Sequence, residues 1–182
     1  DMRSSLLPGA LLTLLVFLPI AGCSHTREES PDVTHQIRSS LDQAGLKDVS
    51  VSQDRAKGVV TLTGTAQSED QRGQAESIAK SIATNQVVAN EVSVEPKNDE
   101  SAAKTENSDI DKGIEKNFDA VLVKHHLNRD VKYDVKNGVV TLTGDVHSQA
   151  QRKDAEKLAH QVPNVRQVVN ELEVKGQKAT TS

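Results

Sequence analysis

Apolar and polar side chains alternate in the same way in two separate stretches of the chain. Residues 58–64 and 138–144 both read Gly-Val-Val-Thr-Leu-Thr-Gly. Successive side chains of a strand point to opposite faces, so Val60 and Leu62 fall on one face and the threonines on the other. We therefore expect a strand with one buried apolar face at each place, bounded by glycines.

An amphipathic helix is predicted directly after each of these strands. Residues 68–71 and 148–151 both have serine at the first position and glutamine at the fourth, which fits a capping box at a helix N-terminus. Apolar residues then recur at spacings of three and four, which is the period of a helix. They are Ala75, Ile78, Ala79 and Ile82 in the first helix and Ala155, Leu158, Ala159 and Val162 in the second.

The two stretches belong to a longer internal repeat. Residues 58–94 align with 138–174 without a gap, and 17 of the 37 positions are identical. A helical pattern and a short alternating strand precede the repeat in both copies, and a valine-rich strand ends it. The chain is therefore expected to be an α+β protein with two tandem αββαβ domains. In each, a right-handed crossover gives a small mixed three-stranded sheet, covered on one face by two helices.

The boundaries of these domains follow from where the patterns stop. The first domain is expected over residues 32–95 and the second over 109–175. Residues 96–108 are mostly polar without periodicity, which predicts a linker, and residues 176–182 predict a disordered tail. Domains of this size bury only about 60% of the surface of their unfolded chain, so an enclosed active-site cavity has little room.

The N-terminal segment predicts export. Arg3 precedes a long apolar run over residues 6–20, which is too short to cross a bilayer comfortably and is typical of a signal peptide, here assigned to residues 1–22. The only cysteine, Cys23, follows small residues at the end of this run, where lipidation would need it; a bystander cysteine behind an ordinary signal peptide is the alternative. Residues 23–31 are mostly polar and charged and predict a tether.

Composition and charge argue against nucleic acid as a partner. The chain has a net charge of −4, only 2% aromatic residues and no tryptophan, so it lacks a stacking platform for bases. No Gly-x-x-Gly loop lies between helices, as RNA-binding KH domains require. Residues 32–95 hold 6 basic and 9 acidic side chains, whereas residues 109–176 hold 11 of each. The second domain is therefore the less repulsive partner for an anionic surface, though it hardly forms a basic patch.

No catalytic, metal-binding or cofactor-binding pattern is present in the sequence. The six histidines form no pair at metal-ligand spacing, and no serine lies in a Gly-x-Ser-x-Gly turn. A phosphate-binding glycine loop is also absent. We therefore predict a protein that is not an enzyme and that uses no metal or cofactor.

Both copies place an asparagine, Asn90 and Asn170, in phase with the valines of the last strand. One interpretation is ligand contact. The other, which we favour, is that the amide hydrogen-bonds backbone groups at the sheet edge or helix end, because a buried amide must find partners. The glycines are likewise interpreted as scaffold and not as a ligand loop. The residues assigned to this structural repeat are Gly58, Gly64, Asn90, Gly138, Gly144 and Asn170.

The repeated residues resemble a known family. Gly-Val-Val-Thr-Leu-Thr-Gly, the Ser-x-x-Gln-Arg-x-x-Ala-Glu helix and the final Val-x-Asn-Glu strand resemble the BON domain, twice. Ile-Ala-Gly-Cys resembles a bacterial lipobox, which implies lipidation of Cys23. The pairing of a lipobox with two such repeats is similar to the dual-BON lipoproteins of the Gram-negative envelope.

This resemblance implies association with a phospholipid membrane and maintenance of envelope integrity, without catalysis. Ser24 after the cysteine favours the periplasmic face of the outer membrane, with the inner membrane as the alternative. The soluble, osmotically inducible periplasmic dual-BON proteins imply a second function, that of a stress-related, chaperone-like or protein-binding adaptor for envelope proteins.

The first helix of the second domain is the predicted membrane contact. Its outer face is expected to show Lys112, Lys116, Asp119, Val123 and His126, with Lys124 and His125 towards the flanks. A valine placed among cations is an arrangement suited to anionic lipid headgroups. In the lipoproteins that the chain resembles, this helix is the implied lipid-facing element. An ordinary solvated face is the alternative, and Asp111, Glu115 and Asp119 on the same helix weaken the attraction. The predicted inward stripe is Ile110, Ile114, Phe118, Val121 and Leu122, and the predicted contact residues are Lys112, Lys116, Val123, Lys124 and His126.

Overall fold

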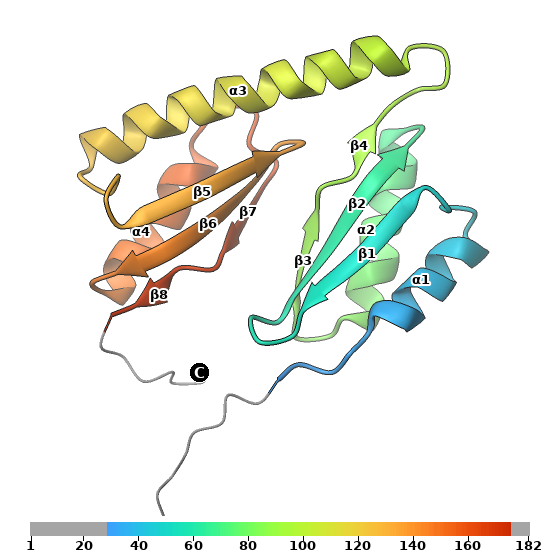
Figure 1. Cartoon of the computed structure of the whole chain (residues 1–182), viewed down its shortest axis with the longest axis horizontal. Helices are drawn as coiled ribbons and strands as arrows, with labels where there is room; N and C mark the ends of the chain where they lie inside the picture. The colour runs from blue at the N-terminus through green and yellow to red at the C-terminus, as the bar shows by residue number, and fades with distance from the viewer. Residues whose placement is uncertain (1–28, 176–182) are drawn as a thin grey trace, which may run out of the picture.

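A computed structural model describes residues 29–175 of the chain. The predicted signal peptide over residues 1–22, the lipidation site Cys23, most of the tether and the tail over residues 176–182 lie outside the described residues. Two domains of the same architecture follow one another, each with helices packed on a small sheet (Figure 1).

The first domain places two helices on a mixed sheet. Strand β1 pairs with β2 in antiparallel fashion, and β2 pairs in parallel with β3 and then with β4. Helix α2 makes the crossover between β2 and these parallel strands. The elements are α1 (Thr34–Gln43), β1 (Val49–Asp54), β2 (Val59–Ala66), α2 (Glu69–Ile82), β3 (Val87–Asn90) and β4 (Ser93–Val94).

The second domain repeats this order and pairing. Strand β5 is antiparallel to β6, and β6 is parallel to β7 and β8. The elements are α3 (Glu100–Lys124), β5 (Val131–Lys136), β6 (Val139–Val146), α4 (Gln149–His160), β7 (Gln167–Asn170) and β8 (Glu173–Val174). The predicted α+β fold with two tandem αββαβ units is therefore confirmed.

In each domain both helices cover the same face of the sheet, as predicted. Val60 and Leu62 of β2 are fully buried in a cluster with residues of α1 and α2. The equivalent residues of β6 lie in a cluster with Phe118 of α3, whose ring stands edge-on to that of Tyr133 with centroids 4.9 Å apart. The alternation read from the signature stretch therefore assigns the buried face correctly.

The helices after the signature strands begin at the predicted capping boxes. The Ser68 hydroxyl accepts a hydrogen bond from the Gln71 amide at 3.3 Å, and the Gln71 side chain accepts one from the Gln67 amide at 2.9 Å. In the second copy the Gln151 amide donates to the Ser148 hydroxyl at 3.1 Å. These bonds satisfy N–H groups that the first helical turn would otherwise leave without partners.

The segment between the domains differs from the expected linker. Residues 96–108 were expected to lack regular structure, but α3 already begins at Glu100 and continues without a break into the second domain. Ala103 and Asn107, one turn apart, are half-buried, and the Asn107 amide donates to the Ser93 hydroxyl at 3.0 Å. Most residues between Glu100 and Asn107 have good helix propensity. Few of their side chains are buried, so the sequence here has no periodic apolar positions from which a helix could have been predicted.

The third strand of each sheet is interrupted. In the first domain β3 ends at Asn90 and β4 begins at Ser93, because the Asn90 side chain accepts the Val92 amide at 3.4 Å. The second domain repeats this with Asn170 and the Leu172 amide at 3.2 Å. The predicted three-stranded sheet thus has its third strand in two pieces, with an asparagine at the break.

The two sheets contact each other on the faces that the helices leave open. Val59 and Ala89 of the first domain form a buried cluster with Val139 and Val169 of the second. Strands β3 and β7 lie next to each other at this contact (Figure 1). The side chain of Gln167 joins them: it donates to the Val88 carbonyl at 2.6 Å and accepts from the Asn90 amide at 3.1 Å.

Two ion pairs flank this interface with the roles of the domains exchanged, although their lysines lie one position apart in the repeat. Lys57 contacts Glu171 at 2.5 Å, and Lys136 contacts Glu91 at 3.2 Å. Glu91 and Glu171 occupy the same position of the repeat, and each pairs with a lysine at the hairpin turn of the other domain. The hydrogen bond with Glu171 raises the pKa of Lys57. The domains are therefore related by an approximate two-fold arrangement.

Candidate functional site

The second half of α3 is fixed to the core of the second domain by the predicted stripe. Ile114, Phe118 and Leu122 are buried, and Ile110 and Val121 are partly buried against the same cluster. Because these five side chains pack against the core from one side of the helix, the opposite side of the helix faces solvent. None of the helices within residues 29–175 has the length and apolar character needed to cross a membrane.

The predicted contact residues are all exposed on that outer side. Lys112, Lys116 and Val123 lie on one stripe, because steps of four and seven residues return to the same side of a helix, whereas Lys124 lies about 100° around from Val123. His126 follows the end of the helix, with φ 57°. The structure therefore places the five residues on or beside one face of α3.

Val123 is the unusual member of this group. The exposed fraction of its side chain is 58%. Among the described residues, Val87 is the only other large hydrophobic residue that is exposed. A single exposed valine is common on soluble proteins. What distinguishes Val123 is its place on the same helix face as Lys112 and Lys116, with Lys124 beside it, although the exposed Asp119 lies on that face as well.

Two of the carboxylates counted against this surface hydrogen-bond to the second domain, although Asp119 itself stays exposed. Asp119 accepts a hydrogen bond from the Tyr133 hydroxyl at 2.7 Å, and Asp111 accepts from the amides of Asn137 and Gly138 at 2.7 and 2.8 Å. Burial and the hydrogen bond to Asp119 raise the pKa of Tyr133. Of the three acidic residues named from the sequence, Glu115 is the one whose exposed side chain has no such inward bond in the described structure.

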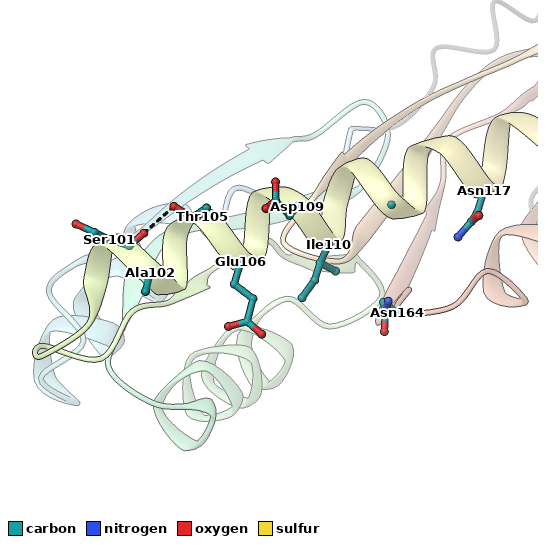
Figure 2. Close-up of a pocket in the computed structure, with 9 residues that line it drawn as sticks. Ser101, Ala102, Thr105, Glu106, Asp109, Ile110, Asn117 and Asn164 are labelled. Carbon is teal, nitrogen blue, oxygen red and sulfur yellow. Dashed lines mark hydrogen bonds between the residues drawn. The ribbon is translucent and has the colours of Figure 1, made fainter.

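An open groove of about 840 Å³ runs along the first half of α3. Figure 2 shows Glu106, Ile110 and Asn117 projecting from one side of the helix, with Asn164 facing them from the second domain. The lining mixes carboxylates, amides and small apolar groups, with no nucleophile and base pair. Sequence reasoning missed this groove because the first half of α3 was expected to be a linker.

The repeated asparagines connect the third strand to the crossover helix. Asn90 donates to the Arg72 carbonyl and to the Glu76 carboxylate, both at 3.1 Å, and Asn170 makes the same pair of bonds in the second domain. Burial alone would raise the pKa of Glu76, but the hydrogen bonds from Lys80 and Asn90 outweigh it and lower the pKa. The amides are thus occupied by the protein itself, which leaves no ligand-binding role to assign.

The four signature glycines all have positive φ values. At Gly64 and Gly144, with φ of 103° and 113°, an added Cβ would collide with the carbonyl oxygens of Asp48 and Asp130. Gly58 and Gly138, with φ of 67° and 78°, lie in the hairpin turns between the first two strands of each domain. Each glycine therefore allows a backbone conformation or close approach that other residues resist.

No group of three or more histidine, cysteine or acidic side chains suited to a metal ion occurs within residues 29–175. The residues that join the domains, above all Gln167, Lys57 and Lys136, were not found from the sequence. The identity of Glu91 and Glu171 was visible in the repeat, but the sequence around them does not indicate which residues they contact.

Comparison with known proteins identifies relatives over most of the chain. The chain is 30% identical over 146 residues to osmotically-inducible protein Y of Escherichia coli, an alignment that covers 79% of this chain and 71% of that protein. It is also 30% identical over 145 residues to an uncharacterized protein in the gshII 5′ region of Anaplasma centrale, with 79% and 93% covered.

Among solved structures, the C-terminal domain of CdsD, a structural protein of the type III secretion system of Chlamydia trachomatis, is similar at 16% identity and a TM-score of 0.32. The alignment covers 78% of this chain and 65% of that one.

The family model of the BON domain matches residues 30–96 and 110–176. These two ranges contain every strand of the structure and end within two residues of the boundaries expected from the repeat. The chain therefore belongs to the BON-domain family, with one BON domain in each half of its described part.

Proposed function

We propose that this protein is an exported, lipid-anchored envelope protein whose second BON domain rests on an anionic phospholipid membrane through the outer face of α3. The observation that carries the proposal is the exposure of Val123 beside Lys112, Lys116 and Lys124 on one helix. An apolar side chain among cations can enter the headgroup region while the lysines attract phosphates.

The electrostatic balance supports the second domain over the first as the contact. The first domain has an excess of acidic side chains, which an anionic surface repels, and the second is balanced. Hydrogen bonds draw Asp111 to the turn between β5 and β6 and Asp119 to the Tyr133 hydroxyl, although Asp119 stays exposed near the lysines. Lipidation at Cys23 would supply the stable anchor, and α3 would add a weaker, salt-sensitive contact.

A link to envelope stress is supported by the relatives. Membership of the BON family and 30% identity to a protein named for osmotic induction favour a role in maintaining the envelope when osmolarity changes. We place the protein at the periplasmic face of the outer membrane, with the inner membrane as the alternative. Membrane fractionation of cells with the wild-type protein and with Cys23→Ala tests this: anchoring requires that the substitution release the protein.

Flotation with vesicles tests the lipid contact. Every described contact lies within residues 29–175, so the polypeptide 24–182 contains both complete cores. It is expected to float with vesicles of phosphatidylcholine and phosphatidylglycerol, and Val123→Glu or Lys116→Glu should abolish this. Arg38→Glu on α1, which reverses an exposed basic residue outside the proposed face, is the matched control and should float normally. If the unmodified polypeptide stays with the soluble fraction, the proposal is wrong.

A second candidate is a protein-binding adaptor, which the groove along α3 favours. Its lining includes Ala102, Ile110 and Gly113, which would let an extended segment or helix of a client envelope protein approach the backbone closely. Salt separates the two functions, because binding to lipid headgroups weakens as ionic strength rises, whereas capture of an apolar segment does not.

A further inference from the structure

Three of the five histidines in the described residues lie at one end of the second domain. His125 and His126 follow the last turn of α3, and His147 follows β6. The carboxylate of Asp130 lies between two basic groups here, 3.5 Å from the His147 ring nitrogen and 3.9 Å from the Lys175 ammonium. We call this region the histidine end, and define it as residues 123–132, 144–147 and 173–175.

The first domain offers an internal comparison, because its backbone follows the same path at this end. The Leu46 amide donates to the Leu41 carbonyl at 2.9 Å, as the Leu127 amide does to Leu122. Gly45 precedes Leu46 with φ 79°, and His126 precedes Leu127 with φ 57°. The positions equivalent to His125, His126 and His147 are therefore Ala44, Gly45 and Gln67.

The two ends differ sharply in charge. The histidine end holds four basic residues (Lys124, Arg129, Lys132 and Lys175) and three acidic ones (Asp130, Asp145 and Glu173). The equivalent segments of the first domain, residues 42–50, 64–67 and 93–95, hold one basic and three acidic residues and no histidine. The scaffold is shared, so the accumulation of histidine and basic residues is not required by the fold.

We propose that the histidine end is an acid-strengthened contact for anionic phospholipid: protonation of His125, His126 and His147 adds positive charge next to Val123 and tightens the hold of the second domain on the membrane. The inference rests on the proposed function and adds its regulation. Histidine is the side chain that gains charge as the pH falls from about 8 to about 5, a range in which phosphodiester headgroups stay ionised.

The position of the histidines suits this role. All three are exposed, so water or a headgroup can reach them. His125 and His126 stand at the C-terminus of α3, where the helix dipole favours a positive charge. Both lie within three residues of Val123, so a charge gained there adds to the attraction at the point where the apolar side chain would enter. His147 faces Asp130, and its protonation offsets a carboxylate that would otherwise repel the headgroups.

Three further charges change the local balance substantially. With neutral histidines the histidine end carries one net positive charge, counted from its four basic and three acidic residues, and with protonated histidines it carries four. Each cation near an anionic membrane surface strengthens binding by about fivefold, so the added charge at the histidine end should give a gain of about tenfold or more. At neutral pH the second domain has equal numbers of basic and acidic side chains, so its overall attraction to an anionic membrane is weak. Three added positive charges would therefore change its affinity for the membrane noticeably.

The test measures binding of the polypeptide 24–182 to vesicles of phosphatidylcholine with a minority of phosphatidylglycerol, at about pH 7.5 and about pH 5.5. The wild-type polypeptide should bind about tenfold or more tightly at the lower pH. The triple variant His125→Ala, His126→Gly, His147→Gln takes the residues of the first domain at all three positions, so the shared backbone accepts them. Whatever its binding at neutral pH, the ratio of its binding at the two pH values should fall well below tenfold.

His160→Gln on α4 is the matched control, because it removes an exposed histidine outside the histidine end and should leave the gain intact. Vesicles of phosphatidylcholine alone should show no gain in either protein. A wild-type polypeptide that binds equally at both pH values, or a triple variant that keeps the full gain, would overturn this inference and leave the lipid contact standing. Absence of binding at both pH values would overturn the lipid contact as well.

Discussion

Gln167→Ala should weaken the contact between the two BON domains, and the effect should be measurable at the backbone amide of Asn90. The Gln167 side chain makes two hydrogen bonds to β3, donating to the Val88 carbonyl at 2.6 Å and accepting from the Asn90 amide at 3.1 Å. Each such bond contributes about 1 kcal/mol net, so the variant should lose about 2 kcal/mol of interdomain stability. Since 1.4 kcal/mol corresponds to a factor of ten, opening of this contact should become about 30-fold more frequent.

Native-state hydrogen exchange measures this directly. The Asn90 amide should exchange about 30-fold faster in Gln167→Ala, because local opening exposes it. Amides within α2 and β2, which lie in the first-domain core, should keep their protection. Val87→Ala is the control: it truncates the equivalent position of the first domain, where the side chain is 47% exposed, and should leave the Asn90 amide unchanged. Equal protection of Asn90 in wild-type and Gln167→Ala proteins would refute this account of the joint.

Three other outcomes are expected. Gly144→Ala should cost at least about 3 kcal/mol in chemical denaturation, because it combines positive φ with a collision against the Asp130 carbonyl; a loss below about 1 kcal/mol would contradict the assigned geometry. Tyr133 is the chain's only tyrosine, so a near-ultraviolet titration should show its raised pKa, and Asp119→Asn should lower it; the linked stability is present below about pH 10 and lost above it. Asn170→Leu should cost about 2–3 kcal/mol, since it removes three hydrogen bonds at the strand break, and an unchanged denaturation midpoint would argue against that role.

Much of each domain could be predicted because its signals are local. The capping serines and the apolar spacing after Ser68 and Ser148 fix where α2 and α4 begin and which side they bury. The alternation in residues 58–64 assigns the faces of β2. In each case the deciding interactions lie within a few residues of the pattern, so a single sequence contains enough information.

The joint between the domains and the start of α3 could not be predicted, because both depend on residues far apart in sequence. Gln167 bonds to β3 across some eighty positions, and nothing around it marks a partner. The first turns of α3 contact the first domain mainly through Asn107, so they have no apolar stripe. The candidate lipid face was predictable as an outer helix face, but the hydrogen bonds of Asp111 and Asp119 were not, because their partners lie in β5 and the turn after it.

The paired bonds of Glu91 with Lys136 and Glu171 with Lys57 have a consequence for how such a chain could arise. Contacts that recur with the roles exchanged are those of an isologous dimer, in which each subunit presents the same patch to the other. A single BON domain of this type would need a second copy to cover Val59 and Ala89, and its assembly would depend on concentration. Joining the two copies in one chain removes that dependence and leaves the ends of the two domains free to diverge, as their different content of histidine and basic residues illustrates.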